Sequence, residues 1–83
     1  MTPPAPRYRL YVRLGCHLCD SAADVLAAAG LAFVRVDIDR DPQLRDEYGS
    51  LVPVCHDSAS DQEFVYPFTA ADLLAATNPR RPT

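Results

Sequence analysis

The 83-residue sequence predicts one α/β domain, in which helices flank a mixed four-stranded sheet and the elements follow the order β-α-β-α-β-β-α. Three observations support this prediction: short alternating or apolar segments typical of strands, segments with helical apolar spacing between them, and capping residues at the expected helix ends. With 48% hydrophobic residues, the chain can bury one modest core. We expect residues 1–83 to form a single domain with flexible ends at 1–6 and 78–83.

The first third of the chain predicts a strand followed by a helix. Residues 7–13 alternate as a half-buried strand does, and Leu14-Gly15 should form the turn after it. The expected buried side is Tyr8, Leu10 and Val12, and the expected outer side is Arg7, Arg9, Tyr11 and Arg13. Residues 17–29 carry small and apolar groups at helical spacing, and Gly30 suits the C′ position. The expected buried face of this helix is Cys19, Ala22, Ala23, Leu26 and Ala27.

The middle of the chain predicts a second strand and a short helix. Residues 31–38 are nearly continuous in apolar and β-branched side chains, which is typical of a strand buried on both faces in a parallel sheet. Asp41 and Pro42 suit the N-cap and the first position of a helix. This helix should run to about Tyr48 and end at Gly49.

The last third predicts a hairpin and a final helix. Residues 51–55 should form a strand interrupted by Pro53, and residues 63–66 should pair with it after a polar turn at 57–61. Thr69 and Asp72 resemble a capping box that opens a helix through Ala76.

Composition narrows the classes of function. The net charge is −3, and the eight basic residues, all arginine, form no basic face, so we expect no nucleic-acid partner. No apolar stretch approaches membrane-spanning length and the first residues lack a secretory signal, so we expect no membrane association. Three cysteines, an odd number, do not suit a disulfide-stapled secreted scaffold. These features favour a cytoplasmic monomer whose thiols are reduced at rest.

The most informative motif is Cys16-His17-Leu18-Cys19, which lies where the first strand gives way to the first helix. Thiols three residues apart at a helix start lie one turn apart on the same side, close enough to form a disulfide. The unsatisfied N–H groups and the macrodipole at a helix N-terminus favour a negative charge on the first sulfur. Because the thiolate is the species that attacks disulfides, the motif favours thiol–disulfide exchange.

Pro53 is the second informative residue. Proline cannot donate to a strand ladder, so its presence in Leu51-Val52-Pro53-Val54 indicates a break in the strand. A cis peptide bond there would expose the backbone of Val52, which could pair with an extended substrate as an added strand does. The alternative is an ordinary edge-strand proline, and the upstream Cys-x-x-Cys motif favours the cis bond.

The combination of these motifs resembles the thioredoxin superfamily and, within it, the small bacterial glutaredoxin-like proteins. The resemblance covers about residues 8–76. The matching segments are Leu10-Tyr11, Gly15 through Asp20, Asp37-Ile38-Asp39, Tyr48-Gly49 and Val52-Pro53-Val54.

This resemblance implies a minimal thioredoxin-like fold and assigns roles to individual residues. Cys16 would be the attacking thiol and Cys19 the resolving thiol, and Pro53 would follow a cis bond. Arg13 stands where glutaredoxins commonly carry a lysine that steadies thiolate or glutathione charge. His17-Leu18 replaces the usual Pro-Tyr pair, and residues 66–69 replace a Gly-Gly turn that helps to hold glutathione. Exchange chemistry is therefore better supported than glutathione as its partner.

Each candidate residue also has a simpler interpretation. His17 is either a cation that stabilises the Cys16 thiolate or a solvated residue at a helix start, and Arg13 is either a cation near the thiolate or a plain exposed arginine. Leu18 should belong to an apolar rim around the thiols. Cys55 should be a buried core thiol, with a second resolving thiol as the alternative.

A metal site is the alternative for the thiol pair itself. Cys55 and His56 could complete a Cys₃His zinc set with Cys16 and Cys19. The strand before the motif and the helix after it favour the redox interpretation, so we expect no metal.

The sequence thus predicts a thiol–disulfide oxidoreductase whose catalytic residues are Cys16 and Cys19. The expected substrate-binding residues are Arg13, His17, Leu18, Val52 and Pro53. The substrate would be a protein or small-molecule disulfide, no cofactor would be bound, and glutathione or a flavoprotein reductase would restore the dithiol. The alternative is a non-catalytic binding module in which Cys16, Cys19 and Cys55 form a metal-holding or regulatory clasp.

Overall fold

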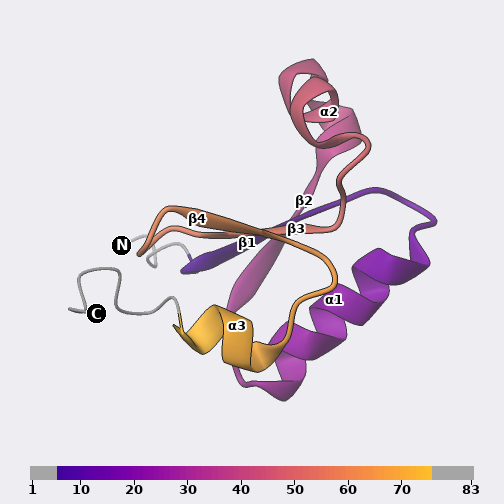
Figure 1. Cartoon of the computed structure of the whole chain (residues 1–83). Coiled ribbons are helices and arrows are strands. Elements are labelled where there is room, and N and C mark those ends of the chain that lie inside the picture. The colour runs from indigo at the N-terminus through magenta and orange to yellow at the C-terminus, as the bar shows by residue number, and fades with distance from the viewer. Residues whose placement is uncertain (1–5, 76–83) are drawn as a thin grey trace, which may run out of the picture.

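The computed structural model describes residues 6–75 and has the predicted order of elements (Figure 1). Except for Pro6, the ends that we expected to be flexible lie outside the described residues. Ala76, the predicted last residue of the final helix, also lies outside them. The elements are β1 (Tyr8–Val12), α1 (His17–Ala28), β2 (Phe33–Asp37), the 3₁₀ turn η1 (Ile38–Arg40), α2 (Pro42–Tyr48), β3 (Val54–Asp57), β4 (Gln62–Val65) and α3 (Ala70–Ala75). No helix in this part of the chain is long and apolar enough to cross a membrane.

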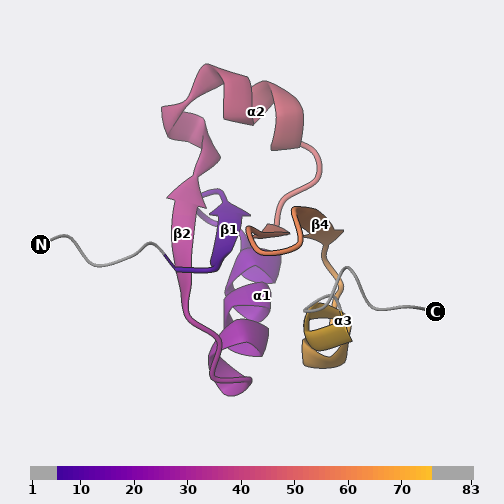
Figure 2. The ribbon, with the colours of Figure 1, turned by 90° about the vertical axis from the view of Figure 1, so that its left-hand side faces the viewer.

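The four strands form one mixed sheet in the order β2-β1-β3-β4. β1 pairs parallel with β2, whereas β3 pairs antiparallel with both β1 and β4. The chain crosses from β1 to β2 through α1, and α1 and α3 lie on one face of the sheet (Figures 1 and 2). α2 follows the end of β2, beyond the strands, in the same views.

The prediction that residues 31–38 form a strand buried on both faces is wrong. β2 is an edge strand, and both Val34 and Arg35 are exposed, Val34 to 40%. A strand is buried on both faces only where helices cover both faces of the sheet. Here α2 covers only the end of the second face, so the apolar run reflects strand preference more than burial.

The main core lies between the sheet and the two helices α1 and α3. Its fully buried members include Leu10 from β1, Leu26 from α1 and Leu73 from α3. The predicted buried face of α1 is confirmed except for Ala27, which is exposed. Near the C-terminal end of the helix, Leu26 is buried and Val25 packs against the core, whereas Ala27 lies outside this contact face.

The prediction that Tyr11 lies on the outer side of its strand is wrong, because Tyr11 belongs to a second, smaller core. Tyr11 is only 7% exposed and stacks on Tyr48 of α2, with ring centroids 4.4 Å apart. Ile38 and Val54 complete this cluster on the sheet face opposite α1. Alternation along one strand cannot reveal that a later helix covers part of its outer face.

The predicted helix ends are confirmed by their capping contacts. An Asp41 carboxylate oxygen accepts the N–H of Gln43 at 2.9 Å to open α2. Thr69 and Asp72 exchange reciprocal hydrogen bonds of 2.8 and 3.1 Å at the start of α3, as a capping box does. After α1, Gly30 adopts φ +72°, a left-handed conformation in which glycine avoids the Cβ penalty.

β3 begins later than predicted, at Val54 instead of residue 51. Pro53 has no N–H to donate, so the ladder starts after it. The N–H groups of Leu51 and Val52 both donate to the Tyr48 carbonyl, at 2.8 and 3.1 Å, so these residues extend the end of α2.

Asp57 is a fully buried carboxylate at the end of β3, where the sequence suggested only a polar turn. It accepts two hydrogen bonds from the Arg7 guanidinium, at 2.7 and 2.9 Å, and others from Ala59 N–H and the Ser60 hydroxyl. These donors, with Arg7 first, lower the pKa of Asp57 to about 2 despite its burial. The pair joins the start of β1 to the β3–β4 turn.

Replacing Asp57 with asparagine should destabilise the fold by about 2 kcal/mol at pH 7, because the charged hydrogen bonds between the buried position 57 and the Arg7 guanidinium are lost. The native pKa lies below the ordinary value of 3.8, so the carboxylate stabilises the fold fully above about pH 4 and loses this effect as the pH falls toward 2. Urea unfolding at pH 7 and pH 3 should therefore show a smaller acid loss in Asp57→Asn than in the wild type. Exposed Asp24→Asn is the matched control, and equal stability of the two variants would contradict the assignment.

Candidate functional site

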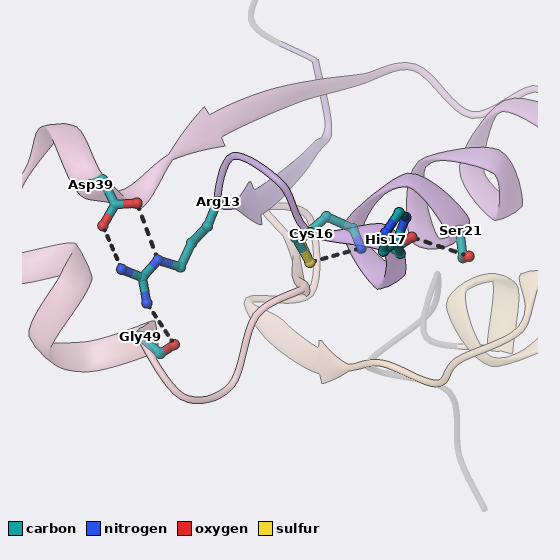
Figure 3. Close-up of a disulfide and its surroundings, with 7 residues drawn as sticks. Arg13, Cys16, His17, Ser21, Asp39 and Gly49 are labelled. Atoms are coloured by element: carbon teal, nitrogen blue, oxygen red, sulfur yellow. Dashed lines mark hydrogen bonds and ion pairs between the residues drawn. A yellow bond between two sulfur atoms is a disulfide. The ribbon is translucent and has the colours of Figure 1, made fainter.

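Cys16 occupies the N-cap of α1, immediately after the turn that follows β1. Its sulfur accepts the backbone N–H of Cys19 at 3.0 Å, the capping contact that a serine or aspartate oxygen usually makes (Figure 3). Cys16 and Cys19 are joined as a disulfide, with their Cα atoms 5.2 Å apart. In the reduced protein, the same helix-end N–H groups would favour negative charge on the Cys16 sulfur.

The two sulfurs differ in their access to solvent. Cys16 is half-buried, whereas Cys19 is only 4% exposed and packs on the buried face of α1. A reagent in solution therefore reaches Cys16 first, and Cys19 remains next to it inside the helix turn. This arrangement suits an attacking and a resolving thiol.

The turn before Cys16 is open and apolar at its tip. Gly15 has φ +75°, a conformation that side-chain-bearing residues rarely adopt, and this bend leads the chain from the turn into α1. Leu14 is 90% exposed and Leu18 is 57% exposed, so the predicted apolar rim at Leu18 lies at the surface. His17 is exposed at the first position of the helix.

Pro53 lies at the same end of the sheet as the thiols. Tyr11 pairs with Val54, so continuing this antiparallel register puts Pro53 beside the end of β1. The Val52–Pro53 peptide bond is cis, and so is the Tyr66–Pro67 bond. The N–H of Val52 is already bound to the Tyr48 carbonyl, so its carbonyl is the group left for an added strand.

Arg13 does not pair with the sulfurs. Its guanidinium forms two hydrogen bonds with the Asp39 carboxylate, at 3.1 and 3.0 Å, and a weaker one with the Gly49 carbonyl at 3.5 Å. Figure 3 shows the side chain extending away from Cys16 toward these two partners. Arg13 therefore ties the thiol-bearing turn to the segments before and after α2, and Asp39 neutralises much of its charge.

A pocket of about 200 Å³ lies beside the thiols on the β2 side of β1, whereas Val52 and Pro53 lie on the β3 side. Both cysteines line it, and its charged lining residues are Arg13, Asp20, Arg35 and Asp37. Arg35 is not among the residues predicted from the sequence, because only the parallel pairing of β1 and β2 brings it to the pocket beside Cys16.

Cys55 is a buried core thiol, as the first of its two interpretations predicts. It is fully buried opposite Leu10 in β1, and burial raises the pKa of this thiol to about 12. His56 contacts Asp61 at 2.8 Å instead of the cysteines. Within residues 6–75, no three histidine, cysteine or acidic side chains are placed to hold a metal ion, so the metal-clasp alternative gains no support from the geometry.

Comparison with solved structures finds the same architecture in other proteins. The crystal structure of the structural-genomics target XcR50 from X. campestris is 41% identical, with a TM-score of 0.75 over 89% of this chain and 99% of that one. Its solution structure matches with 40% identity and a TM-score of 0.74 over 93% and 99% of the two chains. Protein Ne2328 from Nitrosomonas europaea is 25% identical, with a TM-score of 0.63 over 92% and 94% of the chains.

The fold is thioredoxin-like, as these neighbours and the mixed four-stranded sheet with its helices indicate. A comparison with curated proteins finds no match. The model of the Glutaredoxin-like domain (DUF836) matches residues 7–77, which is most of the chain. The protein therefore belongs to the glutaredoxin-like domain family.

Proposed function

We propose that this protein is a thiol–disulfide oxidoreductase that works through Cys16 and Cys19. The observation that supports this most directly is the N-cap position of Cys16, whose accessible sulfur accepts a backbone N–H while its bonding partner stays buried. Membership of the glutaredoxin-like family is consistent with the same chemistry. Fold likeness alone would not establish activity, so the proposal depends on the thiol geometry.

The proposed reaction has two displacement steps. The Cys16 thiolate attacks one sulfur of a substrate disulfide, which forms a mixed disulfide and releases the first substrate thiolate. Cys19 then loses its proton and attacks the Cys16 sulfur, which releases the second substrate thiolate and leaves the Cys16–Cys19 disulfide. Two electrons pass from the protein dithiol to the substrate, and glutathione or a flavoprotein reductase supplies two more in the cytoplasm.

The remaining residues would contribute to substrate binding. Val52 would contact an extended substrate on the β3 flank through its carbonyl. Pro53, predicted as a substrate-binding residue, is fully buried, so its side chain cannot contact the substrate and it would instead hold the Val52 backbone in place. Leu18 and His17 would contact it at the exposed start of α1. Arg13 would act chiefly by holding the turn in place, since Asp39 already binds its guanidinium.

Serine substitutions should separate the roles of the two thiols. Cys16→Ser should abolish reduction of a model disulfide, because no other thiolate is both accessible and stabilised by a helix end. Cys19→Ser should instead accumulate a mixed disulfide on Cys16, since the resolving step is lost. Turnover assays and intact-protein mass spectrometry would measure both effects.

Cys55→Ala is the matched control for this experiment, because its buried thiol stays protonated near neutral pH. It should keep most of the activity if the variant remains folded by circular dichroism. Wild-type turnover in Cys16→Ser would remove Cys16 from the assigned role.

Titration against glutathione should show whether the pair is redox-active in the cytosolic range. We expect the Cys16–Cys19 disulfide to be reduced at cytosolic poises of about −220 to −320 mV, with glutathionylated Cys16 detected by mass. The Cys16→Ser variant should form no such adduct. A disulfide that stays oxidised well below about −300 mV would indicate a structural bridge.

A further inference from the structure

The pocket between the thiols and β2 has a charge pattern that the exchange reaction itself does not need. Phe33 packs against the main core on the α1 side, and strand alternation places Arg35, two residues later, on that same face. Arg35 thus enters the pocket beside Cys16 and Cys19. Among the described residues, its guanidinium forms no hydrogen bond or ion pair.

Two carboxylates share this pocket with Arg35. Asp20 is exposed in the first turn of α1, and its side chain has no hydrogen-bonding partner within residues 6–75. One oxygen of Asp37 accepts the N–H of Asp39 at 3.0 Å, and its other oxygen has no hydrogen-bonding partner in the part of the chain that the structure describes. Arg13 also lines the pocket, but its guanidinium is bound to Asp39. Of the two cations in the pocket, Arg35 is therefore the one without a partner among the described residues, and the carboxylates beside it are within reach of a ligand.

We propose that this pocket binds the free α-amino and α-carboxylate groups of a cysteine-type disulfide, with Arg35 bound to the carboxylate and Asp20 or Asp37 to the ammonium group. The inference rests on the proposed function and names its substrate class as small disulfides such as cystine. In cystine, the sulfur is bonded to Cβ, and the neighbouring Cα carries both the ammonium and the carboxylate group. Paired hydrogen bonds from arginine to a carboxylate also orient the ligand.

The size and position of the pocket favour a small molecule over a peptide segment. Its volume of about 200 Å³ is several times the ~30 Å³ that a water molecule occupies, enough for one amino acid. It lies on the β2 flank of β1, whereas Val52, whose carbonyl would contact an extended peptide, lies on the β3 flank.

The reaction needs no reagent beyond the reduced protein. Cys16 thiolate attacks one cystine sulfur, the cystine S–S bond breaks, and one cysteine leaves as a thiolate that takes up a proton. Cys19, having lost its proton, then displaces the second cysteine from Cys16. Two electrons move from the protein dithiol to cystine, and two cysteine molecules and one protein disulfide result.

The test compares four disulfides in single-turnover oxidation of the reduced full-length protein, followed by mass spectrometry. Cystine carries both charged groups, 3,3′-dithiodipropionate only carboxylates, cystamine only ammonium groups, and bis(2-hydroxyethyl) disulfide neither. Arg35→Gln should lower the second-order rate constant about tenfold for the two carboxylate-bearing disulfides and less than about twofold for the other two. Asp20→Asn should selectively slow the two ammonium-bearing disulfides.

Arg9→Gln is the matched control, because Arg9 is also an exposed strand arginine but lies in β1, outside the pocket. Its rate constants should stay at wild-type values for all four disulfides. If Arg35→Gln lowered the rate constants of all four disulfides equally, the proposal would be overturned, because Arg35 would then act on the thiolate and not on the ligand. Unchanged rate constants for all four would overturn it as well. If the wild type reacts with none of the four, the proposed exchange function fails and this inference fails with it.

Discussion

The hydrogen bond from the Cys19 N–H to the Cys16 sulfur is the interaction on which the site depends. It makes one cysteine both the N-cap of α1 and the exposed member of the thiol pair. The parallel β1–α1–β2 unit points the N-terminus of α1 toward the carboxyl ends of these strands. The parallel arrangement of β1 and β2 therefore sets the direction of α1, and this direction places the Cys16 sulfur at the helix end that favours negative charge.

Separate contacts hold the surroundings of this helix end in place. Arg13 joins the turn before Cys16 to Asp39 and to the carbonyl of Gly49, so three segments far apart in sequence meet at one guanidinium. At the opposite end of β1, the buried Asp57 binds Arg7. In a chain of 83 residues with a modest core, these ion pairs supplement apolar burial in fixing how the loops lie on the sheet.

The sheet order gives the thiol pair two different flanks. On the β3 side lies the half-buried Val52 with its backbone carbonyl, next to the fully buried Pro53. On the β2 side lies a charged pocket with Arg35 and two aspartates. An extended polypeptide suits the first flank because strands recognise backbone, and a small zwitterion suits the second because its recognition rests on charge. If the proposed function holds, partner choice would depend on which flank contributes more binding energy.

The sequence alone determined the order of the main elements, the caps at Asp41 and Thr69, and the position of the thiol pair at a helix start, because these depend on neighbours within a few residues. It misassigned Tyr11 as an outer residue and residues 31–38 as a strand buried on both faces, since helix coverage is a long-range property. Tertiary structure alone decided that Arg13 binds Asp39, that Asp57 is buried against Arg7, and that Arg35 lies beside the sulfurs. Arg13 and Asp39 are 26 positions apart, Arg7 and Asp57 are 50 apart, and Arg35 is 16 positions or more from the two cysteines. No local pattern encodes which distant strand becomes the neighbour.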